Sequence, residues 1–208
     1  MSLPPTSVLR LAGSQLERFA TAPFCVLPIG SIEFHGPGAA FGTDSTLATG
    51  FAERLATVRD CLLFPAVHYS FVPRLTADRP PAPDIAAPAA SILVCNWWRL
   101  APAGLFGDSD GHGHGGPLEV STTAVFDAGG VDLQQDAAAD IAYEAPWWRG
   151  AAQVVGRGQA PIGFKGYHGR VSQVDIAKGE TIVASVTSEL ARLVDDWLVR
   201  AGADLLTP

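Results

Sequence analysis

The sequence predicts an α/β fold, because two apolar runs with strand character lie on either side of a segment with helical spacing. The runs are residues 24–29 (FCVLPI) and 61–69 (CLLFPAVHY). Between them, a helix is expected to begin at Asp44 or Ser45, either of which can act as its N-cap, and to continue to about Arg59. Its apolar residues recur at helical spacing: Leu47, Phe51, Leu55 and Val58. This strand–helix–strand order implies a mostly parallel sheet with a right-handed crossover.

The remaining elements follow from the same kinds of pattern. A short helix is expected at residues 14–20, a third strand at 92–97 and a helix at 118–126. A last helix is expected over residues 180–199, because apolar residues form a stripe along it: Ile182, Val183, Val186, Leu190, Leu193, Val194 and Trp197. Residues 72–90 are rich in proline and have no apolar period, so we expect an extended linker or surface loop there.

Composition and charge exclude several classes of function. At 208 residues, the chain is expected to form a single domain, residues 1–208. The net charge of −7 and the pI near 5.1 argue against a nucleic-acid surface, which needs a basic patch. No segment approaches the roughly 18 apolar residues of a membrane span, and the N-terminus has no signal-peptide pattern. The three cysteines lie in apolar runs, where buried reduced thiols are expected, and this favours a cytoplasmic protein.

Glu33, His35 and Asp44 form the first candidate site. They lie in the stretch EFHGPGAAFGTDS directly after the first apolar run, where open α/β folds bind their ligands. Side chains 33 and 35 fall on the same side of an extended segment, so both can reach one metal ion or two adjacent ions. Two carboxylates and an imidazole are suitable donors for Zn²⁺, Mn²⁺ or Fe²⁺. The alternative is structural, with a loop carboxylate, a core histidine and an N-cap.

His114 and Glu119 form the second candidate site. They lie in the glycine-rich stretch DSDGHGHGGPLE, at a junction of loop and helix that can direct both side chains to one place. Glycines cost backbone entropy, and this cost suits a loop whose backbone must approach a ligand closely. A solvated turn without a ligand is the alternative. His68 and His168 stand alone in the sequence, and a structural role is favoured for each.

Three separated motifs resemble the creatininase (creatinine amidohydrolase) family. LPIGSIEFHGP followed by GTD is similar to the family signature Gly-Ser-x-Glu-x-His-Gly-Pro and Gly-Thr-Asp. The segments WWR and HGGPLEVS resemble a second family region that contains His-Ala-Gly-Glu-x-Glu-Thr-Ser. GYHGRVSQVDIAKGE is similar to a C-terminal family stretch that ends in Lys-Gly-Glu. The three matches occur in the family's order and span most of the chain.

The resemblance implies a three-layer α/β/α domain with a mostly parallel sheet and a two-metal amidohydrolase site. By this resemblance Glu33, His35 and Asp44 hold divalent metal, with Asp44 bridging. Glu119 then belongs to the metal site or to catalysis, and His114 transfers protons or contacts substrate. The implied cofactor is one or two ions of zinc, manganese or iron. Since the family often forms symmetric oligomers, a homo-oligomer or a partner subunit is expected.

The chain departs from the family pattern in three places. Before the Trp-Trp segment, the family carries a helix–strand–helix unit whose Asn-Gly-His-Gly-Gly-Asn turn supplies a metal ligand, but only the proline-rich residues 72–90 stand there in this sequence. Gly38 replaces a histidine, and Pro117 replaces a glutamate. With one ligand missing, a second ion would be poorly held unless His112, His68 or a partner chain supplies the nitrogen.

Three functions remain open at this point. The first is a metal-dependent hydrolase that cleaves a C–N amide bond in a small cyclic or peptide-like substrate, with His114 and Glu119 as its catalytic residues. The second is a catalytically impaired accessory or interaction subunit built on the same scaffold. The third is a small-molecule binding protein with a single structural metal. In none of them is a nucleic acid or a membrane expected as the partner.

Overall fold

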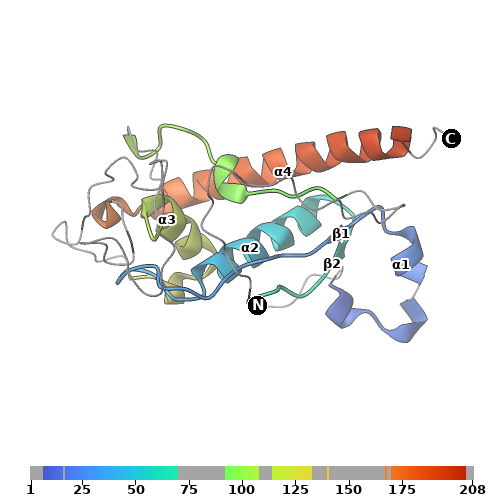
Figure 1. Ribbon diagram of the computed structural model, residues 1–208, viewed down its shortest axis with the longest axis horizontal. Coiled ribbons are helices and arrows are strands. Elements are labelled where there is room, and N and C mark those ends of the chain that lie inside the picture. The colour runs from blue at the N-terminus through green and yellow to red at the C-terminus, as the bar shows by residue number, and fades with distance from the viewer. Residues whose placement is uncertain are drawn as a thin grey trace, which may run out of the picture.

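The computed structural model describes residues 7–15, 17–69, 92–107, 114–132, 140, 167 and 170–204. Its α-helices and strands, in chain order, are α1 (Glu17–Thr21), β1 (Cys25–Val26), α2 (Thr43–Val58), β2 (Leu62–Leu63), α3 (Pro117–Phe126) and α4 (Ile176–Asp204). Helix α2 lies between α4 and the two strands, and α3 packs against both α2 and α4 (Figure 1). None of the helices in these described ranges is long and apolar enough to cross a membrane.

The two strands pair in parallel, with Cys25 opposite Leu62. The pairing resumes at a parallel bridge between Ile29 and Val67, and α2 connects the two strands. The predicted parallel strand–helix–strand unit is therefore confirmed. Both strands are shorter than the predicted runs. Each run contains a proline, Pro28 or Pro65, and proline has no N–H group to donate to a neighbouring strand.

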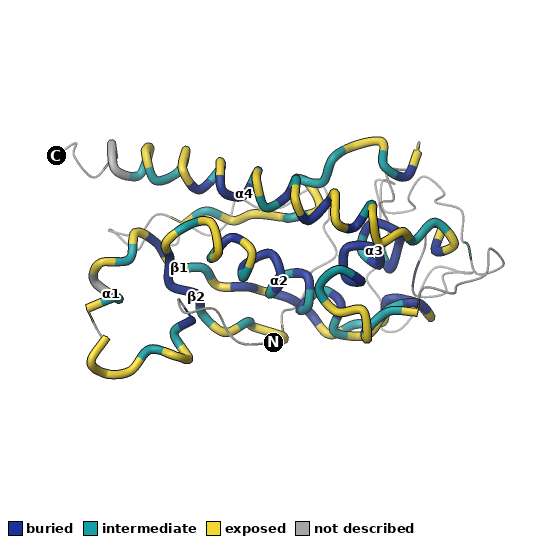
Figure 2. Tube along the Cα trace, turned by 180° about the vertical axis from the view of Figure 1, so that it is seen from behind, coloured by how far each residue is buried: buried dark blue, intermediate teal, exposed yellow. Residues whose placement is uncertain are grey.

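The core lies between the sheet and the long helices. Figure 2 shows the buried residues of α2, α3 and α4 on the sides that face one another. Alternate residues of the first strand region point in opposite directions: Phe24 is buried against this core, whereas Leu27 and Ile29 are 53% and 59% exposed. In the part of the chain that the structure describes, helices therefore cover only one face of the sheet.

Helix α2 follows its predicted pattern except at its two ends. Leu47, Phe51 and Leu55 are buried as expected, but Val58 in the last turn is 47% exposed. The predicted N-cap is wrong. Gly42 occupies the N-cap position without a side-chain hydrogen bond, and Asp44 lies inside the first turn. Its carboxylate is engaged by groups outside the helix and is not available to cap it.

Helix α4 is longer than the predicted residues 180–199, although its buried stripe is confirmed at Ile182, Val183, Val186, Leu190 and Val194. Its early start has a local cause. Oδ1 of Asp175 accepts a hydrogen bond of 2.8 Å from the backbone N–H of Ala177 and a longer one from that of Lys178. This satisfies N–H groups that have no partner within the helix.

Two other expectations are wrong. Residues 92–96 form no strand, and Trp97–Arg99 is a short 3-10 helix whose Trp97 ring stacks on Phe51, with ring centroids 5.2 Å apart. Packing of this aromatic pair thus replaces strand pairing. Of the cysteines, only Cys61 is buried, while Cys25 and Cys95 are exposed. The proline-rich residues 72–90 lie outside the described residues, so the predicted loop there stays a prediction.

Candidate metal centre

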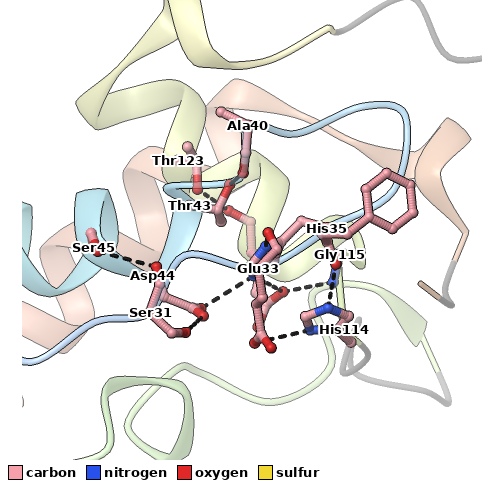
Figure 3. Close-up of polar contacts among 12 residues, drawn as sticks. Ser31, Glu33, His35, Ala40, Thr43, Asp44, Ser45, His114, Gly115 and Thr123 are labelled. Atoms are coloured by element: carbon pink, nitrogen blue, oxygen red, sulfur yellow. Dashed lines mark hydrogen bonds and ion pairs between the residues drawn. The ribbon is translucent and has the colours of Figure 1, made fainter. Parts of the chain in front are cut away.

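The first and second candidate sites form one cluster. The segment 31–35 continues from the end of the β1 region, Asp44 lies in the first turn of α2, and Glu119 lies in the first turn of α3. His114 belongs to the turn that precedes α3 (Figure 3). Helix N-termini favour negative charge, so the starts of α2 and α3 suit the two carboxylates that they carry.

His35 lies at the centre of the cluster, and its side chain is fully buried. Its Nδ1 lies 3.0 Å from the backbone carbonyl oxygen of Glu33. A carbonyl oxygen can only accept a hydrogen bond, so Nδ1 carries the hydrogen. This leaves Nε2 directed at two carboxylates, 3.3 Å from Oδ1 of Asp44 and 3.9 Å from Oε2 of Glu119.

The two carboxylates are held by hydrogen bonds from the chain itself. The hydroxyl of Ser31 donates to Oδ2 of Asp44, which leaves Oδ1 for the histidine. The backbone N–H of Gly115 donates to Oε2 of Glu119 at 2.7 Å. Both carboxylates are largely buried, with 25% and 19% of their side chains exposed. Their positions are therefore fixed before any ligand binds.

The pKa values of the three groups show that the cluster favours positive charge at its centre. Burial alone would lower the pKa of His35, but the hydrogen bond with Asp44 and the charges of Glu119 and Asp44 outweigh burial and raise the pKa to about 9. Burial raises the pKa of Glu119 to about 7, against the attraction of His35. Burial also opposes ionisation of Asp44. The hydrogen bond with His35 and the charge of His35 outweigh burial, so the pKa of Asp44 is lowered.

Glu33 and His114 form a second pair at the edge of the cluster. Nε2 of His114 lies 2.6 Å from the carbonyl oxygen of Phe34, to which it must donate. Nδ1 of the same ring lies 3.8 Å from Oε1 of Glu33. The His35 and His114 rings are 4.4 Å apart between centroids, so this pair adjoins the buried group. Each histidine thus anchors one ring nitrogen on a backbone carbonyl and turns the other toward a carboxylate.

These residues fit a divalent metal ion. The ligand atoms of His35, Asp44 and Glu119 lie within 4.8 Å of one another, and Glu33, His35 and His114 form an overlapping group under the same limit. One imidazole nitrogen with two carboxylate oxygens suits zinc, manganese or iron. The hydrogen bond from His35 to a backbone carbonyl is the kind of support that orients metal-binding histidines.

The structure brings together all five residues that the sequence singled out: Glu33, His35, Asp44, His114 and Glu119. His68, considered as a replacement ligand, is exposed after β2 and belongs to neither group of potential ligands. His112 and His168 lie outside the described residues. Sequence reasoning missed Ser31 and the Gly115 N–H. The only signal for Ser31 was its place beside Gly30, where a strand gives way to a loop.

Comparisons with known proteins agree with this cluster. The family model Creatininase, described as creatinine amidohydrolase, matches residues 11–80, which include Glu33, His35 and Asp44. No curated protein sequence matches the chain significantly. Solved structures match at high probability over nearly the whole chain.

Three of these structures illustrate the similarity. A variant of creatininase, Type II, has a TM-score of 0.72 at 16% identity and covers 94% of this chain and 99% of its own. The structure named Creatininase Mn has a TM-score of 0.70 at 15% identity, with coverages of 94% and 99%. A creatinine amidohydrolase (creatininase) has a TM-score of 0.68 at 18% identity, with coverages of 93% and 98%.

At such identities the structures establish a shared fold, and this confirms the predicted α/β class. The family match is independent of that likeness and falls on the segment that carries the first three candidate ligands. The chain thus shares its fold with creatininases, and its residues 11–80 match the model of the creatinine amidohydrolase family.

Proposed function

We propose that the protein is a metal-dependent amidohydrolase of the creatininase type, which hydrolyses a C–N amide bond in a small cyclic or peptide-like substrate. The observation that carries this proposal is the convergence of His35, Asp44 and Glu119 around the buried Nε2 atom of the histidine. Related structures support it, since one creatininase variant is complexed with creatine and others are named as manganese and zinc forms.

His35, Asp44 and Glu119 are the proposed ligands of the first ion. When bound, a divalent ion supplies Lewis acidity toward an amide carbonyl and lowers the pKa of a water molecule. The protein's own part is to hold three largely buried donors close together. Ser31 and the Gly115 N–H fix the carboxylates, so little reorganisation is needed on binding.

Glu33 is the proposed fourth ligand and belongs to a second ion if one is bound. Its carboxylate is 43% exposed and lies at the open edge of the cluster, within reach of His114. The first ion therefore has a buried, fully prepared group of ligands, whereas a second ion would depend on a more exposed one. The chain is therefore proposed to bind either one ion, at the buried ligands, or two, with the second ion held less firmly.

His114 is the proposed acid and base. Because its Nε2–H is committed to the Phe34 carbonyl, only Nδ1 can exchange a proton. Nδ1 faces the carboxylate of Glu33 at 3.8 Å, at the more exposed edge of the cluster. A proton at Nδ1 would be delivered to the leaving nitrogen as the C–N bond breaks. Glu119 is proposed as a second group that takes part in catalysis, since its Oε2 lies 3.9 Å from Nε2 of His35 within the same cluster.

Hydrolysis of amides by the metal-loaded protein tests this proposal. Creatinine, other small lactams, formamides and peptide amides are incubated with the parent and with Asp44→Asn. The variant keeps the size of the side chain but loses its charge. We expect at least one substrate to be hydrolysed by the parent and not by Asp44→Asn, while His68→Gln retains full activity. Hydrolysis that survives in Asp44→Asn, or none in the metal-loaded parent, contradicts the proposal.

An accessory or interaction subunit is the second candidate, favoured by one observation. Leu27, Ile29 and Val67 are exposed on the sheet face that the described helices leave uncovered. Exposed apolar groups of this kind occur at protein interfaces. This function predicts a stable complex on size-exclusion chromatography of a native extract and no hydrolysis by the metal-loaded chain. A chain that elutes alone and hydrolyses an amide contradicts it.

A further inference from the structure

The loops that carry the proposed metal ligands are in direct backbone contact. A Cβ atom on Gly115 would lie only 2.2 Å from the carbonyl oxygen of His35, so no side chain fits between the two loops. Gly36 and Gly115 have positive φ angles of 81° and 67°. Both values favour glycine, which has no Cβ atom to strain. The distance between His35 and Glu119 thus depends on how these two loops pack.

One aromatic side chain from a distant part of the chain packs on both loops. A Cβ atom on Gly36 would lie 2.5 Å from Cγ of Tyr167, and one on Gly115 would lie 3.2 Å from its Cβ. Tyr167 is 6% exposed. Its side chain therefore lies against the two glycines that flank the candidate ligands, one next to His35 and one whose N–H holds Glu119.

The segment that follows Tyr167 is itself anchored near the site. Val171 is buried, and the backbone N–H of Asp175 donates to the hydroxyl of Ser121 in α3 at 3.0 Å. Gly179 in α4 packs against the carbonyl of the same serine. Helices α3 and α4 thus hold residues 171–175 in place. Tyr167, which comes earlier in the chain, packs on the loops at 35–36 and 114–115.

We propose that Tyr167 is a positioning residue for the metal centre. It holds the His35 loop against the Gly115 loop and so sets the separation of His35 and Glu119. Metal sites need such support, since loosening the groups behind the ligands weakens binding. This proposal rests on the proposed metal-dependent function.

Cobalt binding to the full chain tests the role of Tyr167. Co²⁺ reports affinity by titration and ligand geometry by its visible absorption spectrum. Tyr167→Phe keeps the ring that packs on Gly36 and Gly115, and so separates the effect of the ring from that of the hydroxyl. Tyr167→Leu and Tyr167→Ala are expected to bind about 10- to 100-fold more weakly, with a changed spectrum. The leucine variant retains apolar bulk and remains informative if the alanine variant does not fold.

Val171→Ala serves as the matched control for lost stability. Val171 is buried in the same segment, but the atoms nearest to Gly36 and Gly115 belong to Tyr167 and His35. We expect this variant to lower the melting temperature without changing cobalt affinity or spectrum. Equal binding by Tyr167→Leu and the parent, or equal weakening by Val171→Ala, overturns the proposal. A parent that binds no cobalt contradicts the proposed metal centre itself, and with it this role.

Discussion

Nε2 of His35 lies 3.3 Å from Oδ1 of Asp44, with the imidazole completely buried. The opposite edge of the same ring donates to the Glu33 carbonyl, so the ring cannot turn without losing this hydrogen bond. The protein thus keeps a basic nitrogen in a buried position beside a carboxylate. In the metal-free chain a proton on Nε2 balances the neighbouring negative charge, as the raised pKa of His35 indicates. A divalent cation would balance it as well.

Replacing His35 by glutamine should abolish tight metal binding. The change removes the one nitrogen donor of the buried group and leaves Asp44 and Glu119 facing each other. The loss of zinc affinity should exceed the roughly 10- to 100-fold that removal of a supporting hydrogen bond costs. Isothermal titration of chelator-treated protein measures it. His68→Gln, an exposed histidine outside the cluster, is the control and should bind like the parent.

Ser31→Ala should weaken metal binding without abolishing it. The serine hydroxyl orients Asp44 by donating to Oδ2, and the alanine variant leaves that carboxylate free to rotate. A loss of about 10- to 100-fold in affinity is expected. Thr57→Ala, which removes an exposed hydroxyl bonded to the Arg54 carbonyl, is the control. If Ser31→Ala binds zinc as tightly as the Thr57→Ala control, the hydrogen bond has no role in the site.

The metal-free protein should lose stability as the pH rises from about 6 to about 9. The folded state raises the pKa of His35 from 6.5 to about 9, so it holds this proton more tightly than the unfolded chain does. The resulting stabilisation is complete below the unfolded pKa and is lost as the pH rises through the folded one. Glu119, raised from 4.5 to about 7, acts in the same direction over a lower range.

Melting temperatures with a chelator present, measured across this pH range, check the prediction. The His35→Gln variant should show a shallower decline than the parent, because it lacks the titrating imidazole. Metal affinity should follow the opposite trend and increase with pH, since the ion displaces the proton from His35. Parallel pH profiles for the parent and His35→Gln would show that the imidazole does not titrate as described.

Gly179→Ala should destabilise the fold although alanine favours helices. The glycine lies in α4 where a Cβ atom would come 2.1 Å from the carbonyl oxygen of Ser121 in α3. Overpacking costs about 1–3 kcal/mol, and a backbone atom at 2.1 Å puts this site at the upper end, above the gain of about 1 kcal/mol in helix propensity. Urea unfolding measures the balance. Gly13→Ala, where no atom lies within 4 Å of the added Cβ, should be nearly neutral.

Local patterns in the sequence predicted the helices and the pairs of ligands that lie near each other. Leu47, Phe51 and Leu55 are buried as their spacing indicated, and the last helix buries most of its expected stripe, with Leu193 and Trp197 partly buried. The alternation of residues 33 and 35 was less informative. His35 reaches the buried cluster, whereas the side chain of Glu33 adjoins His114 and its backbone carbonyl holds the His35 ring. A two-residue period cannot distinguish these roles.

Contacts between distant segments were not predictable from those patterns. Nothing in the spacing of residues 92–97 showed that Trp97 would stack on Phe51 in a 3-10 helix, with no strand formed. Asp44 had the usual features of an N-cap, but Ser31 and His35 compete for its carboxylate. The packing of Tyr167 on Gly36 and Gly115 joins three parts of the chain. Such contacts depend on the tertiary fold.

Zinc titration of the chelator-treated full chain, with the parent compared to Asp44→Asn, is the most direct test of a metal centre at these residues. The parent should bind at least one equivalent of zinc and have a higher melting temperature in the bound form. Asp44→Asn, which lacks the charged oxygen beside Nε2 of His35, should bind far more weakly and show little change in melting temperature. A parent that binds no zinc, manganese or iron, or an Asp44→Asn variant that binds as tightly as the parent, would contradict a metal centre at these residues.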